Sequence, residues 1–170
     1  MFHAFDKDGR SQKATRPEWM ALLARSPLQL LERAISPLQS QLTLQWLRQP
    51  ETGLYMLQGR AGGTGARFNL GEVTVTRCTL RCSTPEAADS VGVAYVLGRT
   101  HRHVQLAAIA DALLQTPQHH ATLSQQLLEP IRSYLRAQQA ERQKRAHATK
   151  VDFFTVAREA GEDDNDEEQE

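Results

Sequence analysis

The sequence predicts an α+β fold, in which a four-stranded antiparallel sheet is preceded by short helices and followed by two longer helices. Apolar residues recur at helical spacing near both ends of the chain, whereas residues from about 41 to 99 alternate between apolar and polar side chains. The alternating segments are joined by short links, which favours antiparallel pairing. Helices on either side of such a sheet in the sequence are typical of the α+β class.

The first helix is expected to begin at Thr15. Thr15 and Glu18 have the spacing of a capping box, in which the side chain of each residue accepts a hydrogen bond from the backbone N–H of the other. Ser26 is followed by proline, so we expect it to end this helix and to act as the N-cap of the next. Ser36 is also followed by proline and should end the second helix.

Four strands are expected in the middle of the chain. They are residues 42–48, 54–58, 72–83 and 91–99. Residues 49–53 (Gln-Pro-Glu-Thr-Gly) have turn chemistry and should separate the first two strands. In the third strand, Thr74, Thr76 and Cys78 fall on one face and Arg77 on the other.

Two helices are expected after the sheet, over residues 104–114 and from 121 to about 145. Pro130 lies within the second of them and should kink or split it, because proline lacks the N–H group that a helix interior needs.

The charge of the chain is unevenly distributed. There are 20 basic and 20 acidic residues, but residues 159–170 contain eight of the acids, so residues 1–158 carry 20 basic and 12 acidic side chains. We expect a flexible leader over residues 1–14, one domain over 15–158 and a disordered acidic tail over 159–170. A basic domain favours an anionic partner, either nucleic acid, a phosphorylated small molecule or an acidic protein.

The sequence contains no apolar run near the ~18 residues that a membrane span needs, and its first residues lack the apolar core of a signal peptide. We therefore expect no membrane association and a cytoplasmic location.

The segment GRAGGTGARFNLGE, residues 59–72, is rich in glycine and in polar groups. Its glycines at 62, 63 and 65 allow positive φ angles, so that successive N–H groups could converge on a phosphate, with Arg60 and Arg67 closing on it. No Gly-Lys-Ser/Thr follows, and the segment leads into a strand rather than a helix. A wide turn between two strands is therefore favoured over a phosphate cradle on the spacing by itself.

Three polar side chains on one face of the third strand could form a catalytic surface. Glu72, Thr76 and Cys78 supply a carboxylate, a hydroxyl and a thiol at even spacing. The alternative is that Cys78 is a small core residue, as isolated strand cysteines usually are. Cys82 lies four residues further on, about 13 Å away along a strand, which is too far for a disulfide.

Four histidines form two close pairs. His101 and His103 flank an arginine, and His119 and His120 follow a proline. A His-x-His pair needs a third ligand from elsewhere, including from another chain, to hold a metal ion. Exposed histidines at helix starts are the favoured interpretation, and we expect no metal.

Five stretches of the chain occur together, in this order, in one known family. They are RPEWMALLA (16–24), PETGLYMLQGRAGGTGARFNLGEVTVTRC (50–78), GVAYVLGR (92–99), LAAIADALLQ (106–115) and ATKVDFFTV (148–156). On these stretches the chain resembles the PhnG family, a subunit of the bacterial carbon–phosphorus lyase system, over nearly all of residues 15–158. Where relatives continue with Arg-Gly-Glu, this chain has Arg158-Glu159-Ala160.

The resemblance implies a cytoplasmic complex that lets bacteria use alkylphosphonates as a source of phosphorus. It implies PhnH, PhnI and PhnJ as partners in a core complex and the ATPase-like PhnL as a further partner. In this complex methylphosphonate displaces adenine from ATP to give ribose 1-methylphosphonate 5-triphosphate. ATP (or GTP) is then a substrate of the complex, and no cofactor is expected on this chain by itself.

The resemblance also implies that the glycine-rich segment completes a triphosphate or phosphonate pocket at a subunit boundary. The residues expected to bind substrate are Arg60, Gly62, Gly63, Thr64, Gly65, Arg67, Asn69 and Arg77. The residues expected to shape or polarise the site are Glu72, Thr76 and Cys78, and those expected to anchor a partner are Lys150, Asp152, Phe153 and Phe154.

Functions of different classes remain open at this stage. The chain is either a transferase subunit that contributes residues to the active site or a non-catalytic scaffold that orders PhnI. A weaker alternative, independent binding of nucleic acid, follows from the basic composition of residues 1–158 and is not expected.

Overall fold

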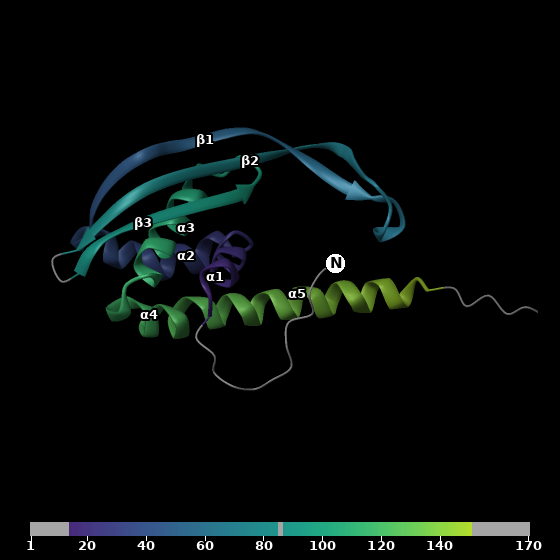
Figure 1. Cartoon of the computed structure of the whole chain (residues 1–170). Helices are drawn as coiled ribbons and strands as arrows, with labels where there is room; N and C mark the ends of the chain where they lie inside the picture. The colour runs from purple at the N-terminus through teal and green to yellow at the C-terminus, as the bar shows by residue number, and fades with distance from the viewer. Residues whose placement is uncertain (1–13, 85–86, 151–170) are drawn as a thin grey trace, which may run out of the picture.

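The architecture is α+β, as predicted, but its antiparallel sheet has three strands in the order β1-β2-β3 within the part of the chain described. The computed structural model describes residues 14–84 and 87–150, so nearly all of the expected leader and the whole of the acidic tail lie outside it. The elements are α1 Arg16–Leu23, α2 Leu28–Ile35, the 3-10 turn η1 Ser36–Gln41, β1 Thr43–Arg60, the 3-10 turn η2 Ala61–Gly63, β2 Arg67–Thr84, β3 Ala87–Leu97, α3 His101–Leu114, α4 Pro117–Leu123, the π turn η3 Ser124–Leu128 and α5 Glu129–Ala148. The labelled helices lie on one side of the curved sheet (Figure 1).

The two short N-terminal helices begin and end close to the predicted positions. Glu18 Oε2 accepts a hydrogen bond from the backbone N–H of Thr15 at 2.8 Å, as a capping box requires. The prediction that Ser26 caps α2 is wrong, since the N-cap residue is Pro27. The Ser26 hydroxyl instead donates to the carbonyl of Leu23 at 2.8 Å, at the end of α1.

The first two predicted strands are one strand, β1, and the predicted turn over residues 49–53 is wrong. The pairing of β1 with β2 shifts register between Trp46 and Arg48 and again between Arg48 and Glu51. These irregularities place the extra residues outside the hydrogen-bonded ladder and let the strand bend without reversing. Pro50 is compatible with this course because β1 is an edge strand.

The strand β2 begins at Arg67, five residues earlier than predicted, and its first part has no partner in β3. The pairing of β3 with β2 ends where Leu97 lies opposite Val75, whereas β1 continues along β2 until Arg60 lies opposite Arg67. Residues 54–74 therefore continue as a two-stranded ribbon that extends beyond α1, α2 and α3, while α5 runs below it in the same direction (Figure 1). We call residues 54–74 the arm, residues 60–67 its tip, and residues 54–59 with 68–74 its shaft.

The core lies between the inner face of the sheet and the helices, with α3 at its centre. Along α3, every residue from Val104 to Leu114 except Gln105 is buried, as expected of a helix that is apolar on most sides. Gly92 of β3 permits this close packing, because a Cβ atom there would lie 1.9 Å from the carbonyl oxygen of Ala108.

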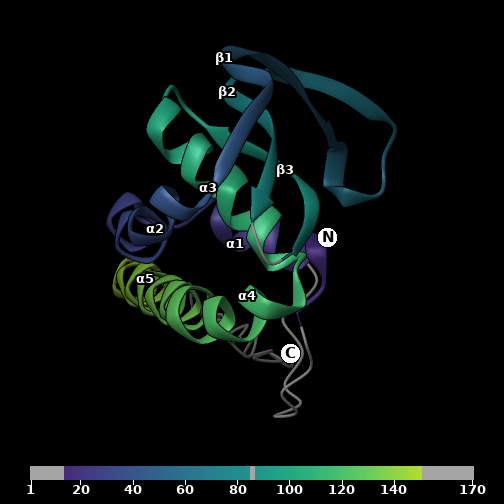
Figure 2. The ribbon, with the colours of Figure 1, turned by 90° about the vertical axis from the view of Figure 1, so that its left-hand side faces the viewer.

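The long C-terminal helix is interrupted just before Pro130, as predicted. The π turn η3 joins α4 to α5 and ends at the residue before Glu129, so Pro130 falls in the first turn of α5, where its missing N–H is tolerated. Of α5, Ile131 is buried, and the helix lies on the far side of the other helices from the sheet (Figures 1 and 2). Within the described ranges, no helix has the length and apolar character that crossing a bilayer requires.

Candidate functional site at the tip and base of the arm

The glycine-rich segment forms the tip of the arm. Gly62 and Gly63 have φ angles of 58° and 80°, a left-handed conformation that favours glycine and turns successive N–H groups toward one side. Gly65 differs from the prediction, since its φ is not positive. Its N–H donates to the carbonyl of Ala61 at 3.0 Å and is therefore committed to the turn.

Two arginines flank this turn. Arg60 and Arg67 lie directly opposite each other in the last pair of the β1–β2 ladder. The guanidinium of Arg60 donates through Nη1 to the carbonyl of Gly65 at 3.0 Å. In the part of the chain that the structure describes, the ion pairs involve neither arginine, so the tip carries two positive charges without a carboxylate partner.

A second polar cluster lies where the arm joins the rest of the sheet, on the outer face. We call this end of the arm its base, and Arg48, Glu51 and Arg77 the base cluster. Glu51 Oε1 accepts from Arg48 Nη1 at 2.7 Å and from Arg77 Nε at 2.8 Å. The hydrogen bond from Arg77, followed by that from Arg48, lowers the pKa of Glu51. Because Arg77 is held by this carboxylate, its charge is already partly neutralised.

The inner face of the sheet carries a chain of hydrogen bonds at the same level of β1 and β2. The Thr76 hydroxyl is buried and donates to the carbonyl of Gly98 at 2.6 Å. Thr52 Oγ1 lies 3.0 Å from Thr76 Oγ1 and 3.1 Å from His101 Nε2. Thr76 is therefore connected to β1 through Thr52 and, by way of Thr52, to the start of α3, and its hydroxyl is occupied by structural partners.

Cys78 lies in the core. Its thiol is 3.3 Å from the carbonyl of Val104, and burial raises the pKa of the thiol to about 12. A thiolate is the nucleophilic form, so this environment favours the core interpretation of Cys78 over a catalytic one. Cys82 is also buried, and both cysteines are free, in agreement with the expected absence of a bridge between them.

The predicted site residues do not come together in one place. Arg77 follows Arg67 by ten positions in β2, about 33 Å of chain at the usual rise, which exceeds the length of a triphosphate. The Asn69 amide accepts from Gln58 at 3.3 Å within the shaft. Glu72 is exposed opposite Met56, on the face that continues toward Cys78. Of the residues expected to bind substrate, six lie at the tip, Asn69 lies in the shaft and Arg77 lies at the base. Of those expected to act in catalysis, Glu72 lies in the shaft, and Thr76 and Cys78 follow it in β2.

The histidines lie in separate surroundings, and the expectation that they are exposed is wrong for His103 and His120, which are buried. His103 is buried, with Nε2 2.8 Å from the carbonyl of Leu23 and 3.3 Å from Ser26 Oγ, whereas His101 faces Thr52. His120 packs edge-on against the ring of Trp19 at 5.7 Å. Among the described residues, no three His, Cys, Asp or Glu side chains are grouped as metal ligands.

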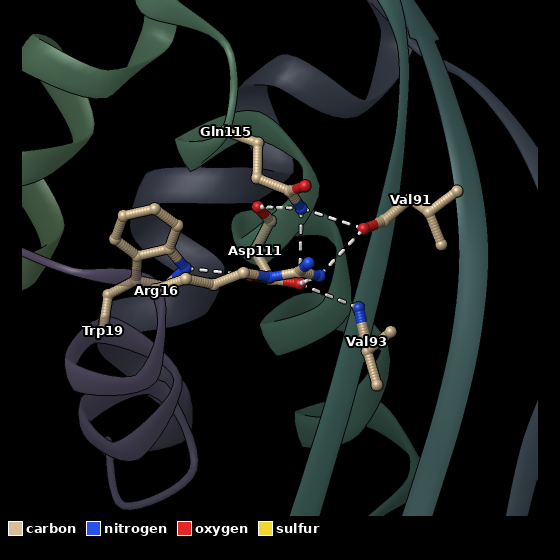
Figure 3. Close-up of polar contacts among 6 residues, drawn as sticks. All are labelled: Arg16, Trp19, Val91, Val93, Asp111 and Gln115. Carbon is tan, nitrogen blue, oxygen red and sulfur yellow. Dashed lines mark hydrogen bonds and ion pairs between the residues drawn. The ribbon is translucent and has the colours of Figure 1, made fainter.

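Sequence reasoning missed the most connected polar group, Asp111 of α3 (Figure 3). Its fully buried carboxylate accepts from Arg16 Nη2 at 2.7 Å, from Trp19 Nε1 at 2.8 Å and from the N–H of Val93 at 2.9 Å. Gln115 donates to the carbonyl of Val91 at 2.8 Å beside it. A single acid within an alanine- and leucine-rich helix was the available signal, and Arg16 and Trp19 were its unrecognised partners.

The predicted partner-binding residues at the C-terminus are largely outside the described chain. Asp152, Phe153 and Phe154 lie beyond residue 150, so their expected role stays a prediction. Lys150, the last described residue, is exposed and follows the end of α5.

Comparisons with known proteins give the chain a family. Residues 14–159 match the family model described as phosphonate metabolism protein PhnG. A relative from Rhizobium meliloti (strain 1021), named alpha-D-ribose 1-methylphosphonate 5-triphosphate synthase subunit PhnG, is 43% identical over 150 residues, which cover 88% of this chain and 92% of the relative. The match with the family model includes the tip and base of the arm and the helix α3, which carries Asp111. The chain therefore belongs to the PhnG family.

Proposed function

We propose that this chain is a subunit of a ribose 1-methylphosphonate 5-triphosphate synthase, and that the tip of its arm binds the polyanionic substrate in an active site shared with another subunit. The observation that carries the first part is the 43% identity, over most of both chains, to a protein named as such a subunit. The second part is supported by the paired Arg60 and Arg67 and the left-handed Gly62–Gly63 backbone between them.

The chemistry of the reaction explains why a cationic tip is useful. An oxygen of methylphosphonate forms a bond to C1 of the ribose, and the bond from C1 to the nitrogen of the nucleobase breaks. The nucleobase leaves with the electron pair and takes up a proton. Both reactants are anions, so bringing them together requires positive charge around them. Arginine supplies this charge with donors arranged in a planar fork that matches phosphate and phosphonate oxygens.

The tip and the base have different parts in this proposal. Thr64 would add its hydroxyl to the tip, and Gly62 and Gly63 would let the backbone approach the phosphates closely. Glu72 is an exposed carboxylate at the end of the shaft nearest the sheet, and it is the one predicted catalytic group that a ligand could reach. Thr76 and Cys78 are buried, and we assign them to the stability of the sheet.

We propose PhnH, PhnI, PhnJ and PhnL as the other subunits, ATP or GTP as the nucleotide and the cytoplasm as the location, on the basis of the family. Since the chain offers no buried acid–base pair at the tip, we assign cleavage of the bond between ribose and nucleobase to another subunit. This chain positions the triphosphate or the phosphonate and neutralises its charge.

The test uses the complex reconstituted with Arg60→Ala, Arg67→Ala and the charge-preserving control Arg60→Lys. We expect each alanine variant to assemble normally and to lower kcat/KM for phosphonate-dependent release of the base by about tenfold to a hundredfold, since a charge-assisted phosphate contact is lost. The control Arg60→Lys should lower kcat/KM by a smaller factor. Cys78→Ala should keep full turnover in the complexes that assemble.

The scaffold function is the second candidate, and the exposed apolar side chains of the arm favour it. Unchanged turnover by both alanine variants in an intact complex would establish a scaffold and reject the shared active site. Failure of the unmodified chain to join the other subunits would reject both.

A further inference from the structure

The shaft of the arm exposes an unusual amount of apolar surface. Leu54 and Tyr55 are 67% and 63% exposed. The large apolar side chains exposed in the shaft are Leu54, Tyr55, Met56, Leu57, Phe68 and Leu70. Large apolar side chains that are exposed together in this way mark an interaction site.

These side chains stand on both faces of the ribbon. In β1, Leu54 and Met56 share the face that continues toward the core, and Tyr55 and Leu57 share the outer face, because successive strand side chains alternate. Side chains on both faces are exposed. The shaft extends beyond α1, α2 and α3, while α5 runs below it in the same direction (Figure 1). A flat partner surface would cover one face and leave the other in water, so the occupant must enclose the ribbon.

We propose that the shaft inserts into an apolar cleft of a different subunit of the synthase, and that this insertion carries the tip to the polyanionic substrate held there. This inference rests on the proposed function and adds the means by which the two chains share one site. The partner is defined by its chemistry, as a cleft lined by aliphatic and aromatic side chains that leads to the bound nucleotide or phosphonate.

The distribution of charge along the arm matches such a cleft. Residues 54–59 and 68–71 contain no charged side chain, so burying this part of the shaft costs no desolvation of an ion. The charges appear together at the tip, where Arg60 and Arg67 have no carboxylate partner in the described chain. An apolar shaft that ends in two cations complements an apolar cleft that ends in an anion.

A second copy of this chain fits the arm less well. Two arms stacked in parallel would bring four arginines together. If two arms stacked antiparallel through their outer faces, the tip of each would approach the base cluster of the other copy. In that cluster Arg48 and Arg77 share the single carboxylate Glu51. Like charges meet in both arrangements, which opposes association.

The experiment measures assembly of variant chains with the other synthase subunits, by co-purification and by titration. One variant, Tyr55→Ser with Leu57→Ser, changes the outer face, and another, Leu54→Ser with Met56→Ser, changes the inner face. The matched control is Tyr134→Ser, which alters a tyrosine of similar size that is 44% exposed on α5. Thermal melting of each free chain checks that it folds, which we expect because the altered side chains are exposed.

We expect each face variant to weaken assembly by at least about tenfold and the control to leave it unchanged, since buried aromatic and aliphatic anchors dominate binding energy. Backbone amides of residues 54–59 and 68–74 should become protected from hydrogen exchange on assembly. Arg60→Ala with Arg67→Ala should assemble like the unmodified chain, which separates the shaft from the tip.

Three results would overturn the inference. Assembly of both face variants at the affinity of the unmodified chain would show that the shaft is not the contact. Loss of assembly with one face variant only would indicate a flat contact instead of a cleft. Concentration-dependent dimers of the free chain, lost in the face variants while assembly with other subunits persists, would assign the arm to a second copy. The proposed function is decided separately, by assembly of the unmodified chain with the other subunits and by the turnover of the Arg60→Ala and Arg67→Ala variants.

Discussion

Asp111 shows how one residue can join segments that are far apart in the sequence. Its carboxylate is fully buried and binds Arg16 of α1, ninety-five residues away, and the backbone of Val93 in β3. Burying a carboxylate is costly unless its oxygens accept several hydrogen bonds, and here they do. The residue therefore fixes the position of α1 and α3 against the edge of the sheet.

Replacing Asp111 by asparagine should destabilise the fold. The amide removes the charge that pairs with Arg16 and converts one acceptor into a donor facing the indole N–H of Trp19 or the backbone of Val93. We expect the free energy of unfolding to fall by about 2–4 kcal/mol, measured by urea denaturation. Glu141→Gln, which breaks an exposed pair with Arg145, is the control and should change little. Equal stability of the two variants would contradict the assignment.

The thiol of Cys78 should resist alkylation in the folded protein. Its pKa is raised to about 12 by burial, so the thiol stays protonated in the folded state, whereas an unfolded cysteine ionises near pH 8.5. We expect iodoacetamide to label Cys78 slowly up to pH 9 and quickly in urea, in a Cys82→Ala background followed by mass spectrometry. Because the folded pKa is the higher one, the thiol stabilises the fold below the unfolded pKa, and this contribution is lost as the pH rises toward 12. Rapid labelling of the folded protein at pH 8 would place Cys78 in an accessible site.

At the scale of elements, the packing of α3 on β3 depends on the absence of a side chain. A Cβ atom at Gly92 would lie 1.9 Å from the Ala108 oxygen, a backbone atom that cannot turn aside. We expect Gly92→Ala to force the helix and strand apart and to lower the free energy of unfolding by about 1–3 kcal/mol. Gly53→Ala is the matched control, because a Cβ atom there meets nothing within 4 Å. Thermal melting of the two variants makes the comparison, and the inference about close packing fails if they melt alike.

The helices and strands differ in how well local sequence predicted them. The capping box at Thr15 and the break at Pro130 were correct because each depends on residues within one or two turns. The turn over residues 49–53 was wrong because its proline and glycine also suit a bent edge strand, and only pairing with β2 distinguishes the two. For the same reason the sequence predicts a wide turn between the strands at 54–58 and 72–83, although Gly59, Arg60 and residues 67–71 continue the ladder.

At the scale of the whole molecule, the charge of residues 1–158 and that of residues 159–170 oppose each other. The complete chain has a formal net charge of +0 at pH 7, and removing the last twelve residues leaves 20 basic and 12 acidic side chains. We expect the truncated chain to bind DNA weakly and in a strongly salt-dependent manner, and the full chain not to bind measurably, in a fluorescence anisotropy titration at two salt concentrations. Tight DNA binding by the full chain at physiological salt would revive the nucleic-acid function.

The sequence by itself determined that helices precede and follow an antiparallel sheet along the chain, and it determined the family, since these follow from the spacing of residue types along the chain. It also identified the arginines and glycines of the tip. Only the tertiary structure decided that the tip and the base are separate clusters, that Cys78 and Thr76 are buried, and that Asp111 is bound by Arg16. Strand pairing and burial depend on contacts between residues tens of positions apart, and a pattern read along the chain does not contain them.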